Sequence, residues 1–191
     1  MSEERDPVEQ WLEPYDAIAR FVVFVEQFEV AVALATSGRL AQVRMALVAA
    51  DHLAELLVSR HAKRSFESSE QSRWMRREQF GRADRKRIGR DFSRKIHLAE
   101  RKHTAPRWLA VPAILDESDA ALFRLAHRAR NGVYHEDRHN SALLIPLTWL
   151  YLAAVGRAFC RQYEAGSAVG GGGVEARVIE LKRFGYRLPE D

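Results

Sequence analysis

Apolar residues recur at three- and four-residue steps along most of the chain, which is the spacing of one face of an α-helix. This pattern covers residues 8–36, 40–63, 117–134 and 143–163. The two-residue joint Ser37-Gly38 suits a tight helix end and therefore an antiparallel pair. No stretch shows the sustained alternation typical of a strand. The pattern predicts an all-α fold, an antiparallel up-and-down helical bundle of four to five main helices.

The same spacing predicts which side chains are buried. The helix over 8–36 is expected to be largely buried, because Phe21, Val23, Phe24 and Phe28 widen its apolar face. The helix over 117–134 is expected to bury Ala120, Leu122, Phe123, Leu125 and Ala126 and to begin with a cap at Asp116 and Asp119. Cys160, the single cysteine, is predicted to be a core thiol, and His52 and His61 are predicted to be exposed.

Residues 65–105 interrupt this regularity, because Arg, Lys, Glu and Ser dominate and Gly81 and Gly89 occur within a helix-compatible stretch. Two shorter helices with little core burial are expected here. Between Arg60 and Arg107 there are 16 Lys and Arg against six Asp and Glu, although the whole chain carries only +4. Cations neutralise phosphates and aromatic rings such as those of Trp74, Phe80 and Phe92 stack on bases, so this basic segment (60–107) predicts RNA contact. The candidate RNA-binding residues are Arg73, Trp74, Arg76, Arg77, Arg82, Arg85, Lys86, Arg87 and Arg90. An acidic protein partner is the alternative.

The organisation predicted is a bundle over 1–165 that includes the basic helical insertion 65–105, a glycine-rich linker over 166–173, and a tail helix over 174–191. A single cysteine excludes an internal disulfide, and an acidic N-terminus is unlike a signal peptide. The longest uncharged apolar run, 141–156, contains Pro146 and is shorter than the roughly 20 residues of a membrane span. A cytoplasmic protein without membrane contact is expected.

The stretch HRARNGVYHEDRHN, residues 127–140, holds the candidate chemistry. On a helix His127, Arg130, Asn131 and Tyr134 share one face, with His135 at its edge. An imidazole can move the proton of a ribose 2′-OH or protonate a leaving 5′-oxygen. A guanidinium can bind the phosphate and offset its developing charge, and an amide can orient either group. These residue types suit RNA cleavage that needs neither a metal nor another cofactor.

A helical bundle with Arg-Asn-x-x-x-His near the end of its penultimate core helix, here Arg130–His135, resembles the HEPN superfamily (higher eukaryotes and prokaryotes nucleotide-binding domains). The resemblance implies a metal-independent endoribonuclease that acts as a homodimer with a composite cleft. It further implies Arg130 as the phosphate-binding residue, Asn131 as its polar neighbour and His135 as the catalytic acid or base, with His127 and Tyr134 in support. It places the chain among toxin–antitoxin and phage-defence effectors, so an antitoxin or a defence-complex protein is a further expected partner.

Three alternatives stay open. The loose Arg-to-His pattern also matches Arg128 to His135 and Arg90 to His97. His135 and His139, with Glu136 between them, have the spacing of a zinc helix, but no third ligand is evident. Finally, the domain could be a non-catalytic module that binds RNA or a protein partner and retains the motif as a structural element.

Overall fold

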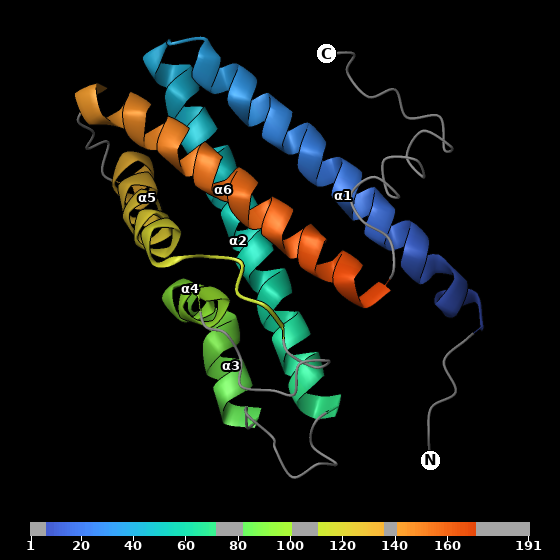
Figure 1. The fold of residues 1–191 in the computed structure, drawn as a ribbon. Coiled ribbons are helices and arrows are strands. Elements are labelled where there is room, and N and C mark those ends of the chain that lie inside the picture. Colours follow the sequence, from blue (N-terminus) through green and yellow to red (C-terminus); the bar gives the residue numbers. More distant parts are fainter. Residues whose placement is uncertain (1–6, 72–81, 101–110, 136–140, 171–191) are drawn as a thin grey trace.

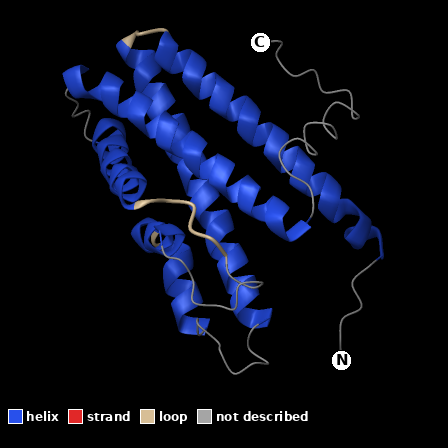
Figure 2. Ribbon diagram, in the orientation of Figure 1, coloured by secondary structure: helices blue, strands red, loops and turns tan. Residues whose placement is uncertain are grey.

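A computed structural model describes residues 7–71, 82–100, 111–135 and 141–170, and the description below is confined to them. Within these ranges every regular element is a helix and no strand occurs, which confirms the predicted all-α fold (Figure 2). The helices are α1 (Pro7–Thr36), α2 (Leu40–Gln71), α3 (Arg82–Arg90), α4 (Phe92–Glu100), α5 (Glu117–His135) and α6 (Ser141–Gly170).

The turn between α1 and α2 makes these two helices antiparallel neighbours (Figure 1). Gly38 adopts a φ of 66°, and its N–H donates to the carbonyl of Ala35 at 3.3 Å. A left-handed residue just after the last helical turn is the usual way to end a helix, and glycine adopts it without steric cost. The prediction of a helix end at Ser37-Gly38 is confirmed.

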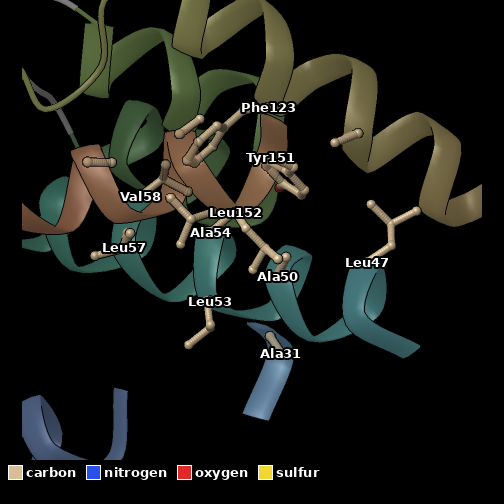
Figure 3. Packing of buried hydrophobic residues seen from close by; sticks show 14 of the residues in the cluster. Ala31, Leu47, Ala50, Leu53, Ala54, Leu57, Val58, Phe123, Tyr151 and Leu152 are labelled. Carbon is tan, nitrogen blue, oxygen red and sulfur yellow. The ribbon is translucent and has the colours of Figure 1, made fainter. Parts of the chain in front are cut away.

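Helix α2 is the centre of the fold, since it contacts every other described helix. The periodicity predicts that six residues of this helix face the core: Val43, Leu47, Ala50, Leu53, Leu56 and Leu57. Five of them are fully buried, and Leu56 is only half-buried. Figure 3 shows Leu47, Ala50, Leu53 and Leu57 in one cluster with Phe123 of α5 and with Tyr151 and Leu152 of α6. The rings of Phe123 and Tyr151 pack edge to face, with centroids 5.2 Å apart. Removing this continuous apolar surface from water is the main stabilising term of the fold.

Four burial predictions are wrong. In α1 only one side is covered, because the helix packs on α2 and α6 alone, and Val23 and Val30 are 47% and 57% exposed. On α5, Leu125 is 49% exposed, because it lies on the side of the helix away from α2. Cys160 is exposed on α6, whereas His61 is buried on α2. Periodicity identifies an apolar face but not which part of it meets a neighbouring helix.

The basic segment contributes to the core more than predicted. The short helices α3 and α4 are present, but α4 buries Ile96, Leu98 and Ala99 against the bundle. The backbone N–H groups of Ile114 and Leu115 both donate to the carbonyl of Ala99, at 2.9 and 3.2 Å. Helix α4 is therefore packed into the bundle and contributes to its core.

The start of α5 is fastened to α6 by a carboxylate–guanidinium network. The Asp116 carboxylate accepts from the N–H of Asp119 at 2.8 Å, which confirms the predicted cap. This bond, with the Ser118 hydroxyl and Arg161, holds the pKa of Asp116 well below its usual range. Asp119 is buried and accepts hydrogen bonds from Arg157 and Arg161. The hydrogen bond from Arg157 to Asp119 raises the pKa of the Arg157 guanidinium.

Helix α6 is longer than predicted, and its last residues include the beginning of the segment expected to be a linker over 166–173. Its stretch Ala142–Tyr163 has 22 residues of mean hydropathy 1.6, which is long and apolar enough to cross a membrane by length and composition. The expectation that no segment is long enough to span a membrane, which was based on the shorter run 141–156, was therefore too strict. This stretch packs on α1, α2 and α5, as the core helix of a globular protein also does.

Candidate functional site

A buried carboxylate in the middle of α2 organises the site. Asp51 is 1% exposed and lies in the apolar face of α2. Its oxygens are contacted from two other helices: Nδ1 of His127 lies 3.0 Å from Oδ2, and the Tyr151 hydroxyl donates to Oδ1 at 2.9 Å. A buried anion is stable only when it is paired and hydrogen-bonded, and these contacts meet that requirement.

Arg130 shares the same carboxylate. Its Nε lies 3.5 Å from Oδ2 of Asp51, and its Nη1 donates to the side-chain oxygen of Asn131 at 2.9 Å. The Arg130 side chain is still 28% exposed. The guanidinium is thus held from two sides while part of it remains accessible to a ligand.

His127 lies one turn before Arg130 on α5, and the two side chains converge on Asp51. The ring of Phe92, from α4, lies against the imidazole with centroids 4.1 Å apart. The His127 side chain is 21% exposed, so it is packed in this cluster and is not fully solvated. Phe92 is partly buried against the core as well as against His127, and its stacking on bases stays a prediction.

A second residue of α2 fixes the far end of the motif. Nη2 of Arg44 donates to the backbone carbonyl of Val133 at 3.2 Å. The last carbonyls of a helix lack partners within it, and a cation near the helix C-terminus also complements the macrodipole. Arg44 and Asp51 therefore hold the stretch from His127 to Val133 against α2.

Tyr151 closes the site from α6. Its burial, and the negative charge of Asp51 that its hydroxyl contacts, raise the pKa of Tyr151 well above the usual value. The phenol stays protonated at any physiological pH and acts as a permanent donor to Asp51. It is a structural donor and not a proton-transfer group.

The remaining predicted residues are placed as follows. The backbone of Tyr134 and His135 belongs to the last turn of α5, and their side chains lie outside the described residues. His139 also lies outside them, so the structure does not describe the zinc arrangement with His135. Arg128 is exposed and donates to the backbone of its own helix, at the carbonyl of Arg124. Arg90 ends α3 and His97 lies in α4, so that match to the motif spans two helices.

The predicted RNA-binding residues are described only in part. Arg73, Trp74, Arg76 and Arg77 lie outside the described residues, as does the side chain of Arg82. On α3, Lys86, Arg87 and Arg90 are exposed, whereas Arg85 is half-buried over the ring of Phe66, 5.9 Å from its centroid. Three of the candidate cations are thus available to a ligand on α3.

Asp51, Glu55 and His127 together have the composition of a metal site. Their ligand atoms lie within 4.8 Å of one another. However, Nδ1 of His127 is already within hydrogen-bond distance of Asp51, and the guanidinium of Arg130 lies beside the same carboxylate. A dication placed there would face a fixed positive charge at close range. We interpret the cluster as a carboxylate that positions a guanidinium and an imidazole.

Sequence reasoning missed Asp51, Arg44, Glu55 and Tyr151. A signal for Asp51 was present, because it stands four residues after Leu47 and three before Ala54, in line with the apolar face of α2. A charged residue at a core position is rare unless it is paired. Its partners, however, lie 76 to 100 residues away in the sequence.

Comparisons with protein-family models, with curated proteins and with solved structures find no match to this chain.

Proposed function

We propose that this chain is a metal-independent endoribonuclease of the HEPN type, which cleaves RNA by attack of the ribose 2′-oxygen on the neighbouring phosphate. The observation that carries the proposal is the convergence of His127 and Arg130, one turn apart on α5, on the buried carboxylate of Asp51. Positioning of a guanidinium by such contacts is what electrostatic stabilisation of a phosphoryl transition state requires.

Arg130 binds the scissile phosphate in this proposal. Asp51 and Asn131 restrict its rotamers before the substrate arrives, so less entropy is lost on binding. The accessible part of the guanidinium then faces the phosphate oxygens, where negative charge increases as the 2′-oxygen attacks. His127 adds a second polar group on the same side of α5.

His135 transfers the protons, following the resemblance of the motif. A base removes the 2′-OH proton as the bond from O2′ to phosphorus forms. An acid donates a proton to the 5′-oxygen as its bond to phosphorus breaks. The products are a 2′,3′-cyclic phosphate and a 5′-hydroxyl, and the reaction consumes neither water nor a metal ion. Two copies of His135 facing each other across a dimer axis supply the acid and the base.

The basic segment guides RNA to this site. Lys86, Arg87 and Arg90 are exposed on α3, and α4 connects α3 to the cluster through the contact between Phe92 and His127. A row of cations next to a cleft raises the local concentration of a polyanion and speeds its association.

The second copy docks on an apolar groove between α5 and α6. The groove has a volume of about 470 Å³, and its walls include Leu125, Gly132, Val133, Leu143 and Leu150. Leu143 and Leu150 are 63% and 58% exposed, so the same patch offers both a hollow and protruding side chains. A two-fold interface needs such self-complementarity. Because Gly132 and Val133 line the groove, the dimer interface would lie within three residues of His135 along the sequence.

We expect Leu150→Glu to convert the dimer to a monomer, because a carboxylate would be buried at the centre of this interface. Sedimentation velocity measures the change. The matched control is Val30→Glu on α1, since Val30 is exposed to nearly the same extent, 57% against 58%, and does not line the groove. Wild-type protein that sediments as a monomer would contradict the proposed dimer.

Incubation with a single-stranded RNA tests the enzymatic proposal. We expect cleavage that is unchanged by a chelator and that leaves 2′,3′-cyclic phosphate ends, detected by their resistance to polyadenylation until they are opened and dephosphorylated enzymatically to 3′-hydroxyls. Loss of cleavage on chelation, or products with 3′-hydroxyl ends, would refute this mechanism.

A non-catalytic module is the second candidate, because a purely structural cation would make the same ion pair as Arg130 makes with Asp51. Such a protein would bind RNA with strong salt dependence, or dock an antitoxin or defence-complex protein, without cleaving RNA. In either case we place it in the cytoplasm.

A further inference from the structure

A second polar pocket lies on the opposite side of α2 from Asp51. It is formed by Arg20 of α1, by Arg60, Lys63, Arg64 and Glu67 of α2, and by Gln162 and Tyr163 of α6, and its volume is about 220 Å³. Arg60 follows Asp51 by nine residues, which on an α-helix is a rotation of roughly 180°. This pocket is therefore separate from the site proposed for RNA cleavage.

Cations dominate the pocket. Four of the seven lining residues are Arg or Lys and only Glu67 is acidic. Glu67 approaches Lys63 at 3.8 Å, and both side chains are more than half exposed, so this pair neutralises little of the charge. Nη1 of Arg64 donates to the backbone carbonyl of Gln162 at 3.3 Å, which joins the α2 and α6 walls. Concentrated positive charge in a concave surface selects an anion.

Two polar atoms of the pocket walls are shielded from solvent and have no hydrogen-bond partner among the described residues. One is Oε1 of Gln162, whose side chain belongs to a residue only 3% exposed, and the other is Nη1 of Arg60. Buried polar atoms in proteins are nearly always paired, and each unpaired one costs free energy. One of these atoms is an acceptor and the other is a donor.

This combination restricts the chemistry of the ligand. An anion without a hydroxyl, such as sulfate, would satisfy Arg60 but would offer nothing to the carbonyl-type oxygen of Gln162, which needs an N–H or O–H donor. A phosphate attached to a sugar offers both, since its oxygens accept from the cations and its hydroxyls donate to Gln162. The volume is below the roughly 300–1,000 Å³ of pockets that enclose drug-sized ligands, so it suits a sugar phosphate and leaves a base outside.

We propose that this pocket binds a terminal phosphate monoester of a ribose, with Arg60, Lys63 and Arg64 contacting the phosphate and Gln162 accepting a hydrogen bond from a sugar hydroxyl. The same chemistry is present in a free nucleoside monophosphate and at the 5′-phosphorylated end of an RNA.

Isothermal titration calorimetry with sulfate and with ribose 5-phosphate tests the assignment. Ribose 5-phosphate is expected to bind at least tenfold more tightly than sulfate, because only the former has hydroxyls that donate to Gln162. Arg60→Gln should weaken both ligands about tenfold or more. The control Arg39→Gln, the same charge change at an exposed position outside the pocket, should alter neither.

Gln162→Leu separates the two halves of the proposal. This variant should keep the affinity for sulfate and lose the preference for ribose 5-phosphate. If Arg60→Gln fails to fold, as judged by circular dichroism, the exposed Lys63→Gln replaces it and should weaken both ligands severalfold. Equal affinities of wild-type protein for the two ligands, or an unchanged affinity in both cation variants, would overturn the proposal.

The source of the phosphate is decided by three further titrations in the His135→Ala protein, which removes cleavage from the measurement. Adenosine 5′-monophosphate is compared with a tetranucleotide RNA carrying a 5′-phosphate or a 5′-hydroxyl. Binding of the mononucleotide alone identifies a free nucleotide as the ligand, and binding of only the 5′-phosphorylated RNA identifies an RNA end. Binding of neither overturns the proposal. These readouts measure binding, so their failure is distinct from a failure of RNA cleavage.

Discussion

Replacing Arg130 by alanine is expected to lower the rate of RNA cleavage about 10²–10³-fold, the usual loss when one preorganised charge-stabilising donor is removed. The change should appear mainly in kcat, because the charge on the phosphate oxygens is larger in the transition state than in the bound substrate. Arg130→Lys should recover little, since an ammonium lacks the planar donors that can contact the phosphate, Asp51 and Asn131 together. Single-turnover cleavage of a labelled RNA measures all of these rates.

Arg128→Ala is the matched control for this experiment. Arg128 lies on the same helix, is exposed and contacts only the backbone of α5 among the interactions described here. It also begins the competing Arg-to-His match, so the control decides between two alignments of the motif. A larger loss in Arg128→Ala than in Arg130→Ala would move the phosphate-binding role to Arg128.

His135→Ala should lower cleavage by about 10²–10⁴-fold if His135 is the general acid or base.

The fold was predictable from the sequence because helical periodicity is a local signal. Each apolar face recurs within its own segment, and Gly38 and Asp116 end and begin helices through contacts that span no more than three residues. The errors have a different origin. Val23, Leu125 and Cys160 lie on apolar faces, and their exposure depends on which helices pack nearby, which no local pattern contains. Helix α2 extends past residue 63 because its polar continuation holds no glycine or proline up to Gln71.

The candidate site was predictable only on one helix. The spacing of His127, Arg130 and Asn131 within α5 placed them on one face, and the structure brings the first two to a common partner. That partner comes from α2, and the donor that completes it, Tyr151, comes from α6. A contact between residues this far apart in the chain is set by tertiary packing. The positions of Asp51 and Tyr151 along their helices could therefore indicate that each is a buried polar residue. They could not indicate that the two side chains contact each other.

Replacing Asp51 by alanine is expected to destabilise the protein by about 3 kcal/mol, at the lower end of the cost of breaking a buried ion pair. His127 and Arg130 would then lie close together without the carboxylate between them, and the Tyr151 hydroxyl would lose its acceptor inside the core. Urea denaturation followed by circular dichroism measures the loss. The partial exposure of His127 and Arg130, 21% and 28%, keeps the effect from being larger.

Asp119→Ala provides the matched comparison, because Asp119 is also 1% exposed and also contacts two nitrogen-bearing side chains, in this case two arginines. Its partners Arg157 and Arg161 are more exposed, at 50% and 36%, so water can solvate them once the carboxylate is gone. We therefore expect a smaller loss than for Asp51→Ala. Asp51→Asn, which keeps the shape of the side chain and removes its charge, should retain more stability while still impairing RNA cleavage, because Arg130 loses the anion that orients it. The contrary result would be equal destabilisation by the two alanine variants together with full cleavage by Asp51→Asn. Asp51 would then only stabilise the fold, and Arg130 would bind the phosphate without a partner on α2.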